Sequence, residues 1–375
     1  MDNKWVAIWG NAISRGEYKP EMYGKDFTLR YPVTSVFDGD KLRFHFSGIC
    51  NKQGSEITKA CISHKDADDF TPITFNKNIS GTIPAGGKII SDEIDFNVKR
   101  GDTLYVTMYF GEITELMSCV VSLGPLSDGA KYAMGDLSTT SDFPIESCNG
   151  TSMCYFLETV DILTDAKNRA LIAWGDSITA QSWPEFLTLR ILEKGYENCS
   201  VVKRGVSGTR VLGQYDCVPY AHYGLKGKNR FLRECEVSGA EAVVILQGIN
   251  DIIHPDGKNP FRPMSNLPAI DELKDGLRYY INTAHGLGLK AYLATLTPIE
   301  GWRTYKDFRE EMRNEINAWI RNNDEADGYI DFDMAIRDEN NKKAMRSECD
   351  SGDHLHPNRE GGKAMAWSVP DELIK

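Results

Sequence analysis

The sequence predicts an α/β protein built on a parallel sheet and preceded by an all-β sandwich. Two different spacings of apolar residues along the chain indicate this fold. From about residue 27 to 165, apolar and polar residues alternate in short stretches bounded by turns, as in antiparallel strands. After Asp165, apolar runs alternate with amphipathic helical segments, as in parallel strands joined by helices. Since 375 residues exceed what one core usually organises, we expect two domains, residues 1–165 and 166–375.

The β-rich half is predicted from its alternating runs and from its turns. The expected strands lie at residues 42–46, 89–98 and 104–110. Asp, Gly, Pro and Lys gather between such runs and predict tight turns at residues 38–40, 84–87 and 99–102. Residues 123–151, rich in Gly, Ser, Asp and Pro, have weak periodicity and predict a surface loop.

The second half is predicted from buried-strand runs followed by helical faces. Strands are expected at residues 170–174, 201–202, 243–246, 291–296 and 329–332. Helices are expected through 186–192, from 270 to 284, through 308–319 and near 364–367. This order of elements favours a doubly wound sheet, in which ligands gather beyond the carboxyl ends of the strands.

Composition excludes several classes of partner. The chain has 43 basic and 54 acidic residues, a net charge of -11, which argues against nucleic acid and anionic membranes. No window approaches the roughly 18 apolar residues of a spanning helix. The first residues lack a secretory signal, so we expect a cytoplasmic protein, or a secreted one if a signal peptide has been removed. Homo-oligomerisation stays open.

The nine cysteines predict neither a disulfide framework nor a metal site. Their number is odd, they are scattered, and none forms a C-x-x-C pair. We therefore expect reduced cysteines that fill space in the core, and no cofactor.

Four short motifs carry the candidate chemistry. The first, Gly-Asp-Ser-Ile-Thr at residues 175–179, puts Ser177 at a strand-to-helix turn, where helix N–H groups face a developing oxyanion. Read alone, it is more often a helix cap. The second motif, GVSGTR at 205–210, contains Gly208, whose backbone N–H can approach a substrate oxygen. In the third, GIND at 248–251, the Asn250 amide is a further donor. Read separately, both are ordinary turns.

The fourth motif, DHLHP at residues 353–357, places Asp353 three residues before His356. This spacing lets the carboxylate orient an imidazole that accepts the proton of Ser177. A polar loop is the simpler alternative. A metal site is another, because Asp350 and His354 lie beside this pair, but a zinc site normally draws ligands from a second segment.

Together, in identity and order, the four motifs resemble the signature blocks of the SGNH hydrolases, also called the GDSL esterase/lipase superfamily. The resemblance covers residues 168–375 and implies a three-layer, flavodoxin-like catalytic domain. Carried over by position, it implies that Ser177 is the nucleophile, His356 the base and Asp353 its carboxylate. The implied oxyanion donors are the Ser177 and Gly208 backbone N–H groups and Asn250. No G-x-S-x-G elbow occurs, which argues against an α/β-hydrolase.

Four residues near the predicted strand ends are candidates for substrate contact: Arg210, Gln247, His254 and Trp302. Trp302 has two equal interpretations, a platform for a sugar ring or a side chain that packs over the core.

The β-rich half resembles the jelly-roll-like accessory domain of a two-domain branch of these esterases. The matching stretches are residues 28–46 and 83–110. This resemblance implies a carbohydrate O-acetylesterase acting on acetylated oligosaccharides or polysaccharides. No amphipathic lid is evident, which disfavours a lipase. The alternatives are a lipase-type or thioesterase-type acyl hydrolase of the same fold, and a glycan-binding protein without catalytic activity.

Overall fold

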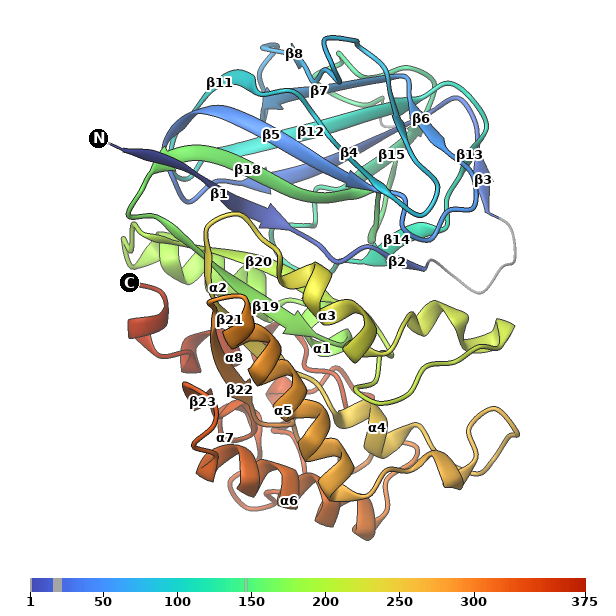
Figure 1. Cartoon of the computed structure of the whole chain (residues 1–375), viewed down its shortest axis with the longest axis vertical. Coiled ribbons are helices and arrows are strands. Elements are labelled where there is room, and N and C mark those ends of the chain that lie inside the picture. The colour runs from blue at the N-terminus through green and yellow to red at the C-terminus, as the bar shows by residue number, and fades with distance from the viewer. Residues whose placement is uncertain (1, 16–21, 145, 147) are drawn as a thin grey trace.

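The computed structural model describes residues 2–15, 22–144, 146 and 148–375. It has two parts, an antiparallel β region above an α/β region in Figure 1. The buried apolar side chains of both parts form one continuous cluster. No helix in the described part of the chain is both long and apolar enough to span a bilayer.

Two antiparallel sheets make the β-sandwich. One consists of β1 (Asn3–Gly10), β18 (Leu157–Asp165), β5 (Gly39–Ser47) and β10 (Lys88–Ile90) in that order, with β11 (Ile94–Val98) also paired to β5. The other has the order β16 (Cys148–Gly150), β15 (Lys131–Met134), β4 (Phe27–Thr34), β12 (Thr103–Phe110), β7 (Lys59–His64) and β8 (Thr71–Pro72). The two sheets pack through the apolar side chains that alternate with polar ones along each strand. Strand β11, for example, buries Ile94, Phe96 and Val98 and exposes the residues between them.

Shorter strands close the ends of the sandwich. They form the small sheets β13 (Thr114–Glu115) with β3 (Tyr23–Gly24), β6 (Ser55–Ile57) with β9 (Gly81–Ile83), and β14 (Ser118–Val121) between β17 (Met153–Tyr155) and β2 (Ser14–Arg15). The last of these sheets lies where the sandwich meets the α/β region (Figure 1).

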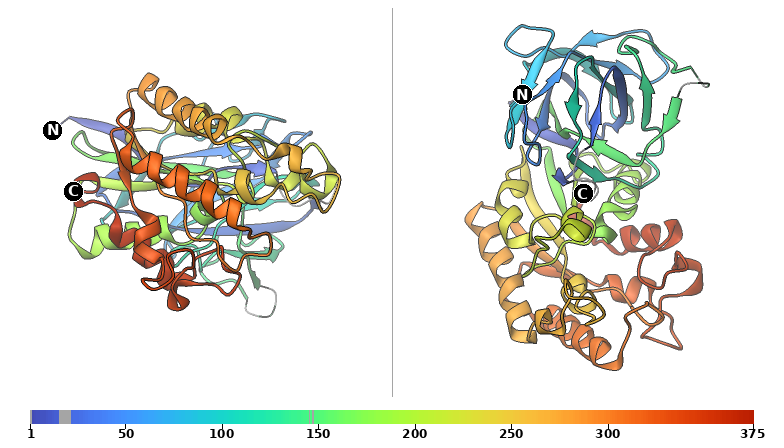
Figure 2. Two further views of the ribbon diagram at one scale, coloured as in Figure 1. Left: turned by 90° about the horizontal axis from the view of Figure 1, so that it is seen from below. Right: turned by 90° about the vertical axis from the view of Figure 1, so that its right-hand side faces the viewer.

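The α/β region is a doubly wound parallel sheet. Its order is β20 (Cys199–Gly205), β19 (Arg169–Gly175), β21 (Ala240–Leu246), β22 (Lys290–Ala294) and β23 (Gly328–Ile330), the flavodoxin-like order. Helices α3 (Gly227–Cys235) and α5 (Ile270–Gly286) cover one face, and α2 (Trp183–Glu193) and α8 (Arg359–Ser368) cover the other (Figure 2). The predicted fold class, a flavodoxin-like parallel sheet with an N-terminal β-sandwich, is confirmed.

The remaining helices are α6 and several short ones. Helix α6 (Asp307–Asn322) packs against α5. The short elements are α1 (Ser177–Ala180), α4 (Ile249–Ile253), α7 (Phe332–Ile336), η1 (Val218–Tyr223), η2 (Met264–Asn266), η3 (Ser347–Cys349) and η4 (Asp371–Leu373). Two of them, α1 and α4, begin directly after strands β19 and β21.

Several sequence predictions need correction. The first strand, β1, was not predicted, because its run is apolar on both faces and shows no alternation. The expected loop at 123–151 contains β15 and β16, which extend the β4 sheet. The single run at 89–98 is two strands, since residues 91–93 leave the ladder. The last two parallel strands are shorter than predicted, and Phe332 begins α7 instead.

Buried polar contacts join the two parts. Arg204, on the edge strand β20, is 3% exposed. Its guanidinium donates to the carbonyls of Asn11 and Glu158, at 2.8 and 2.9 Å, and to the Thr159 hydroxyl at 2.7 Å. These acceptors belong to the β region, and Nε donates to the Glu234 carbonyl of α3 at 3.2 Å, so one cation satisfies polar groups of both parts. The division into two domains at residue 165 stays a prediction.

Replacing Arg204 by Met should therefore destabilise the whole chain. The variant removes buried hydrogen bonds to both parts, so we expect the free energy of unfolding to fall by on the order of 3 kcal/mol. Urea denaturation measures this, with Lys342→Met at an exposed loop position as control. A loss no larger than that of the control would contradict the joining role of Arg204.

Candidate active site

Three predicted motifs meet because three strands end at the same level. In the parallel ladder, Gly175 of β19 is in register with Gly205 of β20 and with Leu246 of β21. Ser177, Gly208 and Asn250 each follow one of these strand ends by a few residues. The edge where an open α/β sheet gathers ligands therefore carries all three motifs.

The three residues predicted to form the triad are hydrogen-bonded in series in the structure. The Ser177 hydroxyl lies 2.8 Å from His356 Nε2, and His356 Nδ1 lies 2.6 Å from Asp353 Oδ2. With Nδ1 donating to the carboxylate, Nε2 is the acceptor that faces the serine. This is the geometry of a nucleophile, a base and an orienting carboxylate.

The loop before α8 is shaped by its own carboxylates. Asp353 Oδ1 accepts the backbone N–H groups of Leu355 and His356, at 3.0 and 2.8 Å. Burial alone would raise the pKa of Asp353, but these bonds and the His356 imidazole outweigh it and hold the pKa below its usual value. The carboxylate is therefore ionised at neutral pH and keeps the imidazole oriented.

The oxyanion candidates surround the same edge. Ser177 is the first residue of α1, so its N–H has no partner within the helix. Gly208 has φ +77, a backbone conformation that favours glycine. Asn250, 2% exposed, donates from Nδ2 to the Thr209 carbonyl at 3.1 Å. An amide has two N–H groups, so this bond fixes its orientation and leaves one donor for a substrate oxygen.

Asp251 connects the second and third motifs. Its carboxylate accepts the N–H groups of Val211 and Leu212, at 2.7 and 3.0 Å, and so holds the segment that carries Gly208. Complete burial raises the pKa of Asp251 to about 6 in spite of these bonds. Sequence analysis did not single out this residue.

Asp176, beside the nucleophile, is also buried. Its Oδ1 caps α1 by accepting the Ile178 N–H at 3.0 Å, and its Oδ2 is buried without a hydrogen-bond partner among the described residues. Burial raises the pKa of Asp176 to about 7, since the single bond from Ile178 opposes it only in part.

The four candidates for substrate contact lie at different depths. The Trp302 ring meets the His356 ring edge to face, with centroids 6.2 Å apart, so it borders the site. Arg210 is buried against the Tyr215 ring at 4.5 Å. Gln247 is 1% exposed and accepts the Tyr280 hydroxyl at 2.7 Å. The structure therefore places Gln247 in the core instead of the cleft.

His254 belongs to an aromatic cluster that sequence analysis missed. It stacks on Tyr223 with ring centroids 5.0 Å apart, and Tyr223 also contacts Tyr215 at 5.7 Å. A Cβ on Gly208 would lie 2.1 Å from the Tyr223 ring, so this ring covers the oxyanion segment. Burial holds the pKa of His254 well below its usual value, so its imidazole is neutral. The tyrosine-rich stretch 215–223 was the available sequence signal.

The residues of the alternative metal site form two separate pairs. Asp350 Oδ2 lies 2.6 Å from His354 Nδ1, and Asp353 is engaged with His356. Among the residues that the structure describes, no three His, Cys, Asp or Glu side chains gather as metal ligands would.

The family comparison matches the half of the chain that carries this site. The model of the GDSL-like lipase/acylhydrolase family matches residues 173–364, just over half of the sequence. The matched range contains all four motifs. Comparison with curated proteins gives no match.

This chain is similar to several solved structures, two of which are as follows. One is Axe2, an acetylxylan esterase from Geobacillus stearothermophilus, with 18% identity, a TM-score of 0.41, and 56% of this chain and 96% of that one covered. The other is a GDSL-like lipase from Bacteroides thetaiotaomicron, with 16% identity, a TM-score of 0.37, and coverages of 55% and 87%.

Removing the Asn250 amide should impair turnover strongly. Loss of one oxyanion donor usually lowers kcat about 100-fold to 1,000-fold, so we expect Asn250→Ala to lose activity in this range. Ester hydrolysis is measured alongside circular dichroism, with the exposed Asn266→Ala as control. Near-parent turnover by a folded Asn250→Ala protein would refute the donor role.

Asp176→Asn should change how stability depends on pH. Because the folded-state pKa of Asp176 is raised to about 7, its contribution to stability is present at low pH. That contribution is lost as pH rises from about 4 through 7. The stability of Asp176→Asn relative to the parent should therefore increase between pH 4 and pH 8, as measured by urea unfolding.

The control for this prediction is Asp324→Asn, an exposed carboxyl whose replacement should give no such trend. A difference between parent and Asp176→Asn that does not vary with pH would mean that Asp176 is ionised in the folded protein at all these pH values.

Proposed function

Because this chain belongs to the GDSL-like lipase/acylhydrolase family, and is therefore an acyl-ester hydrolase, we propose that it removes short acyl groups, chiefly acetyl, from carbohydrates. The observation that carries the mechanism is the hydrogen-bonded series from Ser177 through His356 to Asp353. We propose that the substrates are acetylated oligosaccharides or polysaccharides.

The proposed reaction has two halves. His356 Nε2 takes the Ser177 proton while Oγ bonds to the acyl carbon, and the carbonyl electrons move to an oxyanion held by Ser177 N–H, Gly208 N–H and Asn250. The ester C–O bond then breaks, and His356 returns the proton to the departing sugar hydroxyl. A water molecule next gives a proton to His356 and attacks the acyl-enzyme. The bond from the acyl carbon to Ser177 Oγ breaks, His356 passes that proton to Oγ, and the acid leaves.

The openness of the site supports a polar substrate. The side chains of Asp353 and His356 are 40% and 21% exposed, so the proposed catalytic residues are accessible to solvent. Trp302 adds an aromatic ring beside His356, and such rings suit the apolar faces of sugars. The resemblance of the β region to accessory domains of carbohydrate esterases favours the same substrate class.

The Tyr223 ring supports a short acyl group. It occupies the space directly over Gly208, where a single added carbon would already overlap it. A long acyl chain would have to displace this ring, which also contacts His254 and Tyr215. Acetyl needs no such displacement.

Hydrolysis of p-nitrophenyl esters tests the proposal. The parent protein should hydrolyse the acetate faster than the butyrate and octanoate, and Ser177→Ala should reduce kcat by about 10,000-fold or more. Ser265→Ala, at an exposed position, is the matched serine control. Faster hydrolysis of octanoate would favour a lipase-type enzyme instead.

Two other outcomes would overturn the assignment. Equal activity of the parent and Ser177→Ala proteins would mean that Ser177 is not the nucleophile. Inactivity of both on every ester, with binding to glycans retained, would favour the glycan-binding alternative. If the acetate preference holds, release of acetate from acetylated sugars identifies the carbohydrate.

A further inference from the structure

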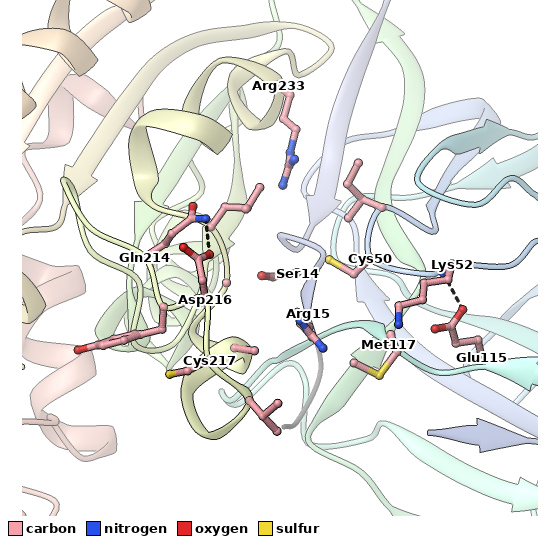
Figure 3. Close-up of a pocket in the computed structure, with 16 residues that line it drawn as sticks. Ser14, Arg15, Cys50, Lys52, Glu115, Met117, Gln214, Asp216, Cys217 and Arg233 are labelled. Atoms are coloured by element: carbon pink, nitrogen blue, oxygen red, sulfur yellow. Dashed lines mark hydrogen bonds between the residues drawn. The ribbon is translucent and has the colours of Figure 1, made fainter. Parts of the chain in front are cut away.

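A cavity lies where the sandwich meets the α/β region. Its volume is about 540 Å³, within the range of small-molecule sites, and its walls come from both parts of the chain (Figure 3). Ser14 and Cys50 stand on the sandwich side, and Gln214 and Cys217 on the α/β side. None of the proposed catalytic residues lines it.

Three cationic side chains border this cavity: Arg15 of β2, Lys52 after β5, and Arg233 of α3. Within the described part of the chain, Arg15 and Lys52 have no ion pair. Arg233 lies 3.6 Å from Glu234, but Glu234 already pairs with the fully buried Arg230. The described residues therefore neutralise these cations only weakly.

The two carboxylates in the wall already have partners. Glu115 Oε2 accepts the backbone N–H groups of Lys52 and Gln53, at 2.6 and 3.1 Å. Asp216 accepts from the Gln214 amide at 2.9 Å. Burial raises the pKa of the Cys50 thiol to about 11, so it adds no negative charge. The wall thus carries more positive than negative charge in a chain of net charge -11.

We propose that this cavity binds the negatively charged unit of a saccharide, whose carboxylate or phosphate lies among Arg15, Lys52 and Arg233. The inference rests on the proposed carbohydrate esterase function and narrows its substrates to acidic glycans. Arginine and lysine suit such anions because charge-assisted hydrogen bonds to them are strong. The carboxylate of Asp216, at the opposite wall, is placed to accept sugar hydroxyls.

One segment connects this cavity to the oxyanion site. Tyr215 lines the cavity and contacts Tyr223, and Tyr223 covers Gly208. Val218 and Ala221 of η1 face the cavity from the same segment. A saccharide bound there would fix the segment that shapes the oxyanion site, so the charged unit should contribute to substrate affinity.

Calorimetric titration of the parent protein tests the inference. The probes are trigalacturonate, the neutral galactotriose, and glucose 6-phosphate, each lacking an acyl group. We expect trigalacturonate or the phosphate to bind at least tenfold more tightly than galactotriose, and this preference to shrink in 0.5 M salt. Whichever anion binds identifies the source of the charge.

Variants locate the binding. Lys52→Gln with Arg233→Gln should weaken binding of the acidic ligand about tenfold or more, whereas Lys342→Gln, in an exposed loop, should not. The single Lys52→Gln variant, at an exposed position, covers the case in which the double variant does not fold, and should weaken binding in the same direction. Equal binding of neutral and acidic sugars, or unchanged binding by the variants, would overturn the proposal.

Failure of this inference can be distinguished from failure of the proposed function. Hydrolysis of p-nitrophenyl acetate by the parent, which involves no sugar, reports on the catalytic residues alone. Ester hydrolysis without preferential binding of acidic sugars would refute the cavity inference only. Binding without hydrolysis of any ester would support the cavity and refute the esterase.

Discussion

The site depends on the absence of side chains at two strand ends. A Cβ on Gly175 would lie 2.3 Å from the Leu246 carbonyl, and one on Gly205 would lie 2.3 Å from the Ala180 N–H. Only glycine therefore lets α1 sit directly against the ends of its neighbouring strands. This close approach brings the serine at the start of α1 to the same edge as the segments after β20 and β21. The proposed nucleophile and oxyanion donors thus depend on close backbone contact among β19, β20, β21 and α1.

Three carboxylates then hold in place the segments that these glycines bring together. Asp176 caps α1, Asp251 holds the segment after Gly208, and Asp353 orders the histidine loop. Each uses a short side chain to satisfy backbone N–H groups that a tight loop leaves unpaired. Asp176 and Asp251 are completely buried and have raised pKa values, so holding these segments in place lowers the stability of the fold. Only Asp353 also contacts the His356 imidazole.

Sequence alone predicted the elements whose pattern is local. The parallel strands and the four motifs follow from apolar runs and residue types, and register explains why they meet. The features that could not be predicted depend on where a side chain points and on packing between segments that are far apart in the sequence. Gln247 follows a strand end, yet it turns into the core to meet Tyr280. Tyr223 covers Gly208 only because a later segment folds back, which no local pattern indicates. Strand β1 was missed because its apolar run shows no alternation, and its partner β18, about 150 residues later, gives no local signal.

The sandwich completes the α/β region physically as well as forming a cavity with it. Strand β20 is the edge of the parallel sheet, and every residue of it is buried because β1 lies against it. The Ser200 hydroxyl donates to the Ala7 carbonyl at 2.6 Å across this contact. An uncovered edge strand is a site of aggregation, and β20 also carries Arg204, whose acceptors lie in the sandwich. Without the sandwich, the α/β region would expose this edge, and Arg204 would lose its acceptors in the β region, so we expect each part to depend on the other for stability.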